Sequence, residues 1–298
     1  MQPRDIRRDM RKRLWDVFSP IVLKIVVGLL VESVVVAVLT LKYLPDAATA
    51  ITAISMEQIL VAVEEDVFKY IVEITALSAI ATMPFLMLMR QSDRRKETLA
   101  GIVQNNKAPL SKYIYIICIS VAFSLGLNNI MLLSDLANYS LAYQEAAEAL
   151  YAPSLAVQLI CLGIITPIME EYIFRGLIFK RIRNYFSARR AIVASAFFFG
   201  MYHGNLVQVI YGTLSGLLLG YLYEKYGSLK APILAHMLMN IVSCILTEAD
   251  VFTWMFSESA RVTVITAACA AIASTMYLFI SRIEEKPATP DGEILQDC

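Results

Sequence analysis

The chain has 298 residues, of which 58% are hydrophobic and only 17% are charged, and its mean hydropathy is +0.60. A soluble domain of this length carries more charge on its surface, so the composition excludes that class and indicates a polytopic membrane protein. Lys and Arg balance Asp and Glu at 26 each, so the placement of the charges is informative where the net charge is not.

Residues 1–19 form a basic arm that precedes the first apolar run. Its cationic residues are Arg4, Arg7, Arg8, Arg11, Lys12 and Arg13. The arm is too charged, and too far from a small-residue cleavage site, to indicate a removed signal peptide. We therefore expect it to stay in the cytoplasm.

Eight apolar runs then reach the length of about 17 to 25 residues that crosses a bilayer core. They are residues 20–41, 67–89, 113–133, 155–180, 188–205, 206–226, 229–247 and 260–281. The predicted fold class is therefore all-α, a polytopic membrane bundle of about eight transmembrane helices.

Loop charges support this count, because cytoplasmic loops of membrane proteins are rich in Lys and Arg. Basic residues gather in the loops after the second, fourth and sixth runs, and acidic residues gather after the first, third and seventh. Both termini are therefore predicted to be cytoplasmic. Residues 137–150 are expected to form a short amphipathic helix on the outer interface, and 284–298 a disordered cytoplasmic tail.

The fourth run contains two adjacent acids, Glu170 and Glu171, so deep in an apolar segment that they are costly without a function. On a helix Glu171 and Arg175 share a face and can pair, while Glu170 points about 100° away. This spacing predicts a structural ion pair and leaves Glu170 as a base facing a cavity. Pro167 removes a nearby helix hydrogen bond and could admit a bend or water. A purely structural charge cluster near the helix end is the alternative.

The chain has two histidines, His203 and His236, and both lie in apolar runs. Phe199 lies one helical turn before His203, and Asn240 lies one turn after His236. Counting 1.5 Å per residue from the basic loops places Glu170 about 15 Å deep, His203 about 18 Å and His236 about 9 Å, so these groups can meet. Glu170 with His203 could activate a water, and the side chains of His236 and Asn240 could donate to an oxyanion. Taken singly, a histidine in an apolar helix is more often a hydrogen-bonded core residue.

Two other patterns do not indicate catalytic residues. Gly212, Gly216 and Gly220 recur every four residues and form a strip against which another helix can pack closely. The five cysteines have no close pair, so they predict neither a disulfide framework nor a zinc knuckle.

Three motifs on successive apolar runs carry a resemblance to a known family: Glu170-Glu171-x-x-x-Arg175, Phe199-x-x-x-His203 and His236-x-x-x-Asn240. They resemble the signature motifs of the CPBP family of intramembrane proteases, which joins the CAAX prenyl endopeptidases to bacteriocin-processing and immunity proteins of bacteria. The stretch 227–233 also resembles the family's approach to its last motif. The resemblance covers roughly residues 150–247.

The resemblance implies a division of roles within this set. Glu170 would activate the water together with His203, and His236 and Asn240 would stabilise the oxyanion. Glu171, Arg175 and Phe199 would support that arrangement. The chain would then comprise the arm 1–19, three transmembrane helices in 20–149, a catalytic four-helix core in 150–247, a last transmembrane helix in 248–283 and the tail 284–298.

The sequence leaves metal dependence open. Glu170, His203 and His236 would be a sufficient set of ligands for a catalytic zinc with one open position. However, these ligands come from three helices and lack the His-x-x-x-His pair that usually anchors such a site. Asn240 is also a poor zinc ligand and a good oxyanion donor. The sequence therefore favours a glutamate-dependent mechanism without a cofactor, with zinc as the alternative.

Two other classes compete with an intramembrane endopeptidase. A non-proteolytic immunity or partner-binding membrane protein of the same fold would have no need of a buried base, and bis-histidine haem ligation explains the histidines but not the acidic pair. The expected partners are the lipid bilayer and a peptide or protein substrate of lipidated, leader or pheromone type; no pattern predicts nucleic-acid binding. The compact loops favour a bacterial plasma membrane, and the depths favour access from the cytoplasm.

Overall fold

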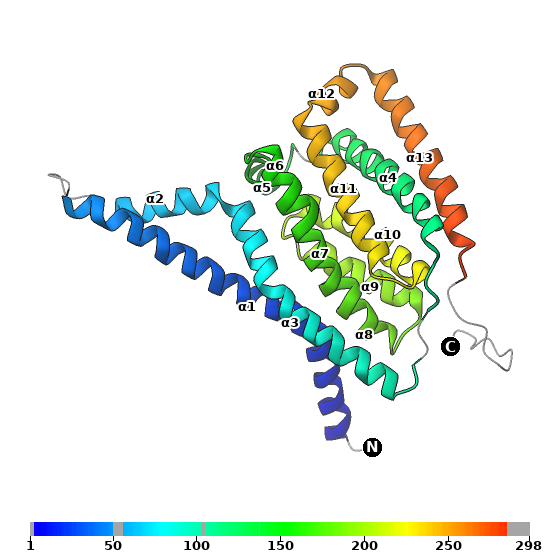
Figure 1. Cartoon of the computed structure of the whole chain (residues 1–298). Coiled ribbons are helices and arrows are strands. Elements are labelled where there is room, and N and C mark those ends of the chain that lie inside the picture. The colour runs from blue at the N-terminus through cyan, green and yellow to red at the C-terminus, as the bar shows by residue number, and fades with distance from the viewer. Residues whose placement is uncertain (1–2, 50–55, 103–104, 137, 285–298) are drawn as a thin grey trace.

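In the computed structural model, the described residues are 3–49, 56–102, 105–136 and 138–284. Within these ranges all the regular structure is helical and no strand occurs. The all-α membrane bundle predicted from composition and apolar runs is therefore confirmed. Figure 1 shows a compact bundle from which a long helical arm extends to one side.

The arm consists of α1 (Pro3–Thr49), α2 (Met56–Lys69) and α3 (Ile71–Leu99). α1 packs against both α2 and α3, and α2 joins them at the far end of the arm (Figure 1). Residues 3–19 of the predicted basic N-terminal segment form the beginning of α1, and the helix continues without a break into the apolar run. Most of the apolar side chains in the span of α1 are exposed on the protein, as they are on helices that face lipid.

The bundle contains α4 (Tyr113–Leu133), α10 (Leu206–Tyr226), α11 (Lys230–Glu248) and α13 (Ser259–Ser281). The 3₁₀ turn η1 (Leu110–Lys112) precedes α4, and the short α12 (Val251–Phe256) connects α11 to α13. α4 packs against both α11 and α13. The predicted division of the chain into units stays a prediction.

A single helical rod crosses the centre of the bundle. Its segments are α6 (Leu155–Ile160), the π segment η2 (Cys161–Ile165), α7 (Thr166–Glu171), the π segment η3 (Tyr172–Phe179) and α8 (Lys180–Arg183). The side chains of its second half are the most deeply buried of the core, and Met169, Phe174 and Phe179 have no exposed surface. π segments are rare and occur often at functional sites.

The predicted glycine strip of α10 packs against α9 (Ala188–Met201). A Cβ atom on Gly216 would lie 2.8 Å from the Cα of Ala196, and one on Gly212 would lie 3.1 Å from the Cα of Gly200. The two backbones therefore approach more closely than side chains would permit, as small residues allow in membrane bundles.

The expected number of spans is corrected from about eight to seven among the described residues. The predicted fifth span, 188–205, is α9, which has 14 residues and a length of about 21 Å, less than a bilayer core of about 30 Å. Gly204 adopts a φ of +84°, and the Asn205 side chain caps α10 by accepting from the Gln208 N–H at 2.9 Å. A tight turn therefore replaces the end of the predicted span.

α9 still leads the chain away from the basic loop and α10 returns it, so Ser19 of α1 and Ser281 of α13 lie at the same basic end, where they accept from Arg181 at 3.1 Å and from Lys225 at 3.0 Å. The cytoplasmic location of both termini stays a prediction.

The predicted short helix at 137–150 is α5 (Leu141–Tyr151), whose N-cap Ser140 accepts from the Tyr143 N–H at 3.3 Å. Residue 137 lies outside the described residues, as does the predicted tail beyond residue 284.

Candidate active site

Glu171 and Arg175 form a fully buried ion pair on the central rod. Arg175 Nη1 donates to Glu171 Oε1 at 2.7 Å, and both side chains have 0% exposure. Arg175 Nη2 donates to the Gly216 carbonyl of α10 at 3.0 Å, and the guanidinium lies 4.6 Å from the centroid of the Phe199 ring. The pairing predicted from the four-residue spacing is present, and it connects the rod to α9 and α10.

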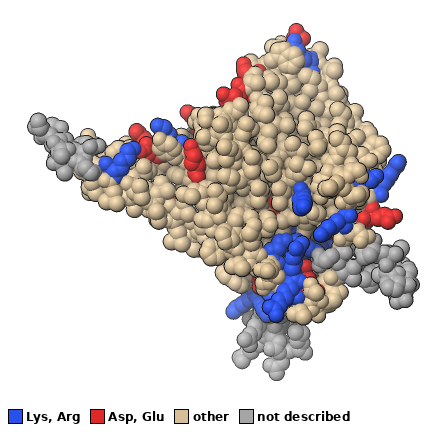
Figure 2. All heavy atoms as spheres, in the orientation of Figure 1, with Lys and Arg blue, Asp and Glu red and all other residues tan. Residues whose placement is uncertain are grey.

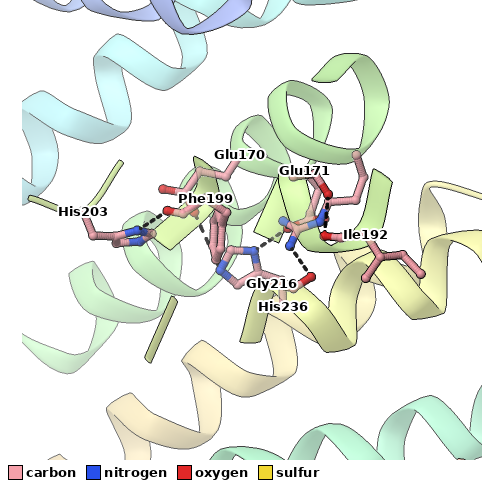
Figure 3. A network of polar contacts seen from close by, with 9 residues as sticks. Glu170, Glu171, Ile192, Phe199, His203, Gly216 and His236 are labelled. Atoms are coloured by element: carbon pink, nitrogen blue, oxygen red, sulfur yellow. Dashed lines mark hydrogen bonds and ion pairs between the residues drawn. The ribbon is translucent and has the colours of Figure 1, made fainter. Parts of the chain in front are cut away.

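His236 of α11 contacts the same carboxylate. Its Nδ1 lies 2.9 Å from Glu171 Oε1. Because a carboxylate oxygen accepts, Nδ1 must carry the hydrogen, which leaves Nε2 bare in the neutral ring. Nε2 lies 3.7 Å from Glu170 Oε2. Glu171 thus fixes the orientation of His236 and directs its second nitrogen at Glu170 (Figure 3).

His203 lies in the turn after α9, where its Nδ1 is 2.8 Å from the carbonyl oxygen of Phe199. A carbonyl oxygen also only accepts, so the hydrogen is again on Nδ1 and Nε2 is bare. The Phe199 ring meets the His203 ring at 4.9 Å and the His236 ring at 5.5 Å, both edge to face. Figure 3 shows Phe199 between the two imidazoles. The aromatic ring therefore fixes the spacing of the two histidines.

Asn240 repairs a break in the central rod. In η2 the Thr166 N–H pairs with Cys161 O, five residues back, and the next donor in that register would be residue 167, which is proline. The Leu162 carbonyl would then lack its partner. Asn240 Nδ2 donates to this carbonyl at 2.8 Å, so one of its two amide hydrogens is committed to the scaffold.

One cavity of about 420 Å³ brings the predicted site residues together. Glu170, Phe199, His203, His236 and Asn240 line it, whereas Glu171 and Arg175 do not. Glu170 and His236 are nearly buried, with 6% exposure each. The buried ion pair of Glu171 and Arg175 therefore lies outside the cavity, whereas the five lining side chains can contact a substrate.

The helix α5 closes one side of this cavity. Its lining residues are Tyr143, Ala146, Ala147, Ala149, Leu150 and Tyr151, and burial raises the pKa of the Tyr143 and Tyr151 hydroxyls. The other lining residues come from the beginnings of α3 and α10, the end of α4, the central rod and the second half of α11. The cavity therefore lies toward the ends of the helices remote from the basic loops, opposite to the cytoplasmic access that the sequence-based depths favoured.

The sequence analysis missed Lys24 of α1. Its side chain is buried to 8% exposure, its Nζ donates to Ser78 Oγ of α3 at 2.8 Å, and its charge attracts that of Glu170. Lys24 is the only cation in the run 20–41. An ionisable residue inside a membrane span is a functional candidate by default, and that signal could have identified it.

The donors do not fit a zinc ion in this arrangement. Among the described residues, no group of three His, Cys, Asp or Glu side chains converges on a common point for a metal. The bare Nε2 atoms and the bound Nδ1 hydrogens are typical of zinc-binding imidazoles. However, Phe199 separates the two rings. Whether the protein depends on a metal therefore stays a prediction.

Comparison with known proteins finds a similarity over the part of the chain that contains the cavity residues described above. Residues 152–242 match the family described as type II CAAX prenyl endopeptidase Rce1-like, and this segment contains all three motifs. The chain is also 28% identical over 112 residues to "Putative membrane peptidase YdiL" of Bacillus subtilis (strain 168), a match covering 38% of this chain and 46% of that protein. The match thus spans less than half of the relative. No solved structure matches the chain.

Proposed function

We propose that this integral membrane protein is an intramembrane endopeptidase. It would hydrolyse a peptide bond of a membrane-associated peptide or protein. The match of residues 152–242 to the Rce1-like family of type II CAAX prenyl endopeptidases supports the proposal. The observation that carries the proposal is the Glu170 carboxylate 3.7 Å from the bare Nε2 of His236 at the wall of a cavity.

The first chemical step is activation of water. Two acceptors 3.7 Å apart can each take one hydrogen from a single water, whose free lone pair then faces the cavity. Glu170 takes one proton while the water oxygen forms a bond to the scissile carbonyl carbon. His203 presents a second bare Nε2 on the other side of Phe199. The structure pairs Glu170 most directly with His236, where the sequence interpretation paired it with His203.

The second step is collapse of the tetrahedral intermediate. Asn240 keeps one amide hydrogen for the oxyanion, while the bare Nε2 of His236 accepts from the hydroxyl that the water has formed on the carbon. Glu170 then returns its proton to the leaving nitrogen as the carbon–nitrogen bond breaks. These steps use only side chains of this chain, so we propose a glutamate-dependent mechanism without a metal.

The substrate would be lipidated, or a leader or pheromone type of peptide. The name of the matched family refers to prenylated CAAX substrates, and for this chain we propose that specificity as one form of the activity. A bacterial plasma membrane is the proposed location.

The test compares peptide products of cells that express the wild type, Glu170→Gln or Glu32→Gln. Both variants replace a carboxylate by an amide in a membrane helix, but Glu32 is exposed on α1, outside the cavity. We expect products to disappear only with Glu170→Gln. Identical profiles for all three inserted proteins would favour a non-proteolytic binding protein. Wild-type protein should also remain active after exhaustive chelation, and restoration of lost activity by zinc alone would contradict the metal-free mechanism.

A further inference from the structure

A second cavity, of about 200 Å³, lies at the basic end of the bundle. Figure 2 shows Lys and Arg gathered at this end, the lower end in that view. The lining contains five cations and one carboxylate: Arg90, Arg94, Lys107, Lys180, Lys230 and Glu224. They come from α3, the loop before η1, α8, the end of α10 and the beginning of α11. Folding therefore concentrates positive charge from distant parts of the sequence in one concave wall, which attracts anions.

The acids near this wall already have cationic partners. Glu224 Oε1 accepts from Arg183 Nε at 3.1 Å, and Arg183 does not line the cavity. Lys180 interacts with the buried Glu97. In the part of the chain that the structure describes, no carboxylate pairs with Arg94, Lys107 or Lys230. The cavity therefore has a surplus of positive charge.

The wall is held in place by contacts behind it. Arg90 is only 9% exposed, and it donates to the Gly176 carbonyl and, at 2.8 Å, to the Tyr223 hydroxyl. Gly227 adopts a φ of +59°, and a Cβ there would lie 2.1 Å from the carbonyl oxygen of Asn106. The Ala108 N–H also donates to the carbonyl of the residue before Gly227 at 3.1 Å. The loop thus packs directly on the end of α10 and forms a preorganised wall.

We propose that this cavity, termed the basic pocket, binds the phosphate group of an anionic ligand. Guanidinium and ammonium groups match phosphate oxygens, and basic pockets between transmembrane helices bind lipid headgroups. The pocket lies where α3, α10 and α11 reach their basic ends, and basic residues next to membrane spans attract anionic headgroups. Lys230 precedes His236 by six residues, or about 9 Å along α11. This site is distinct from the catalytic cavity and does not rest on the proposed function.

The test uses the delipidated full-length protein in a nonionic detergent. Its binding of phosphatidylglycerol, of phosphatidylcholine with the same acyl chains and of inorganic phosphate is measured by native mass spectrometry and thermal shift. The variant Lys107→Gln/Lys230→Gln removes two exposed lining cations. The matched control Arg95→Gln/Arg189→Gln removes two exposed cations that do not line the pocket. Both variants lose the same charge, so any difference between them reports on position.

We expect phosphatidylglycerol to bind more tightly than phosphatidylcholine, and the lining variant to bind it at least about tenfold more weakly than the control does. If inorganic phosphate does not compete with phosphatidylglycerol, the bound phosphate belongs to a lipid headgroup. If it competes at millimolar concentration, the pocket binds free phosphate. Both results support the proposed site. Equal binding of all lipids and no phosphate binding would overturn it. Equal losses in the lining and control variants would overturn it as well.

Discussion

Glu171 and His236 are joined by a hydrogen bond of 2.9 Å between Oε1 and Nδ1, deep inside the bundle. The same oxygen accepts from Arg175 at 2.7 Å, so one carboxylate atom connects an arginine on its own rod to a histidine on α11. The position of Nε2 in the proposed active site therefore depends on a buried ion pair that no substrate touches.

This dependence predicts that Glu171→Gln lowers stability as well as activity. The substitution leaves Arg175 buried without its partner, which costs about 3 to 5 kcal/mol. Thermal unfolding of the purified protein measures the loss. Replacing both partners, as in Glu171→Leu/Arg175→Met, should recover much of the stability while activity stays low, because His236 loses its acceptor. A Glu171→Gln variant with wild-type stability would contradict a structural role for the pair.

Asn240 and Pro167 give a second prediction through the carbonyl of Leu162. Asn240→Leu removes the donor to that carbonyl, and a buried unpaired carbonyl costs about 1 to 3 kcal/mol. Pro167→Ala restores a backbone N–H at the position that the π register pairs with Leu162. The double variant should therefore be more stable than Asn240→Leu alone, as a double-mutant cycle of unfolding can show. If the double variant recovers stability but not activity, Asn240 also acts in the reaction. If the two substitutions change the free energy of unfolding additively, Asn240 does not compensate for Pro167 at the Leu162 carbonyl.

The packing of α9 on α10 predicts a contrast between two glycines of the same strip. A Cβ on Gly216 would lie 2.8 Å from the Cα of Ala196, whereas one on Gly220 would meet its nearest atom at 3.4 Å. Gly216→Ala should therefore push the helices apart and cost about 1 to 3 kcal/mol. It should also lower activity, because the Gly216 carbonyl binds Arg175. Gly220→Ala serves as the control, and similar unfolding temperatures for the two variants would contradict this account.

The sequence was sufficient to predict that Glu170, His203 and His236 meet at one cavity, because ionisable groups in apolar runs are rare and have to meet. The spacing of Glu171 and Arg175 also predicted their pairing, since helix geometry is local. The end of α9 was missed because apolar residues continue on both sides of the turn. The positive φ of Gly204 and the capping side chain of Asn205 end one helix there and begin the next. The π register that leads Asn240 to Leu162, and the packing of α5 over the cavity, depend on contacts between distant helices.

Lys24, a buried cation inside the apolar run 20–41, leads to a further prediction. Its ammonium is held by Ser78 at 2.8 Å and attracts the Glu170 carboxylate. Lys24→Met keeps the length of the side chain and removes the charge, so the protein should fold and insert normally. We expect kcat/KM for a peptide substrate to fall on the order of tenfold, about 1.4 kcal/mol of transition-state stabilisation. Lys24→Arg should retain more activity than Lys24→Met, since it keeps the charge. If the two variants lose activity equally while remaining stable, the charge of Lys24 has no part in positioning Glu170, and the contact between α1 and α3 is only packing.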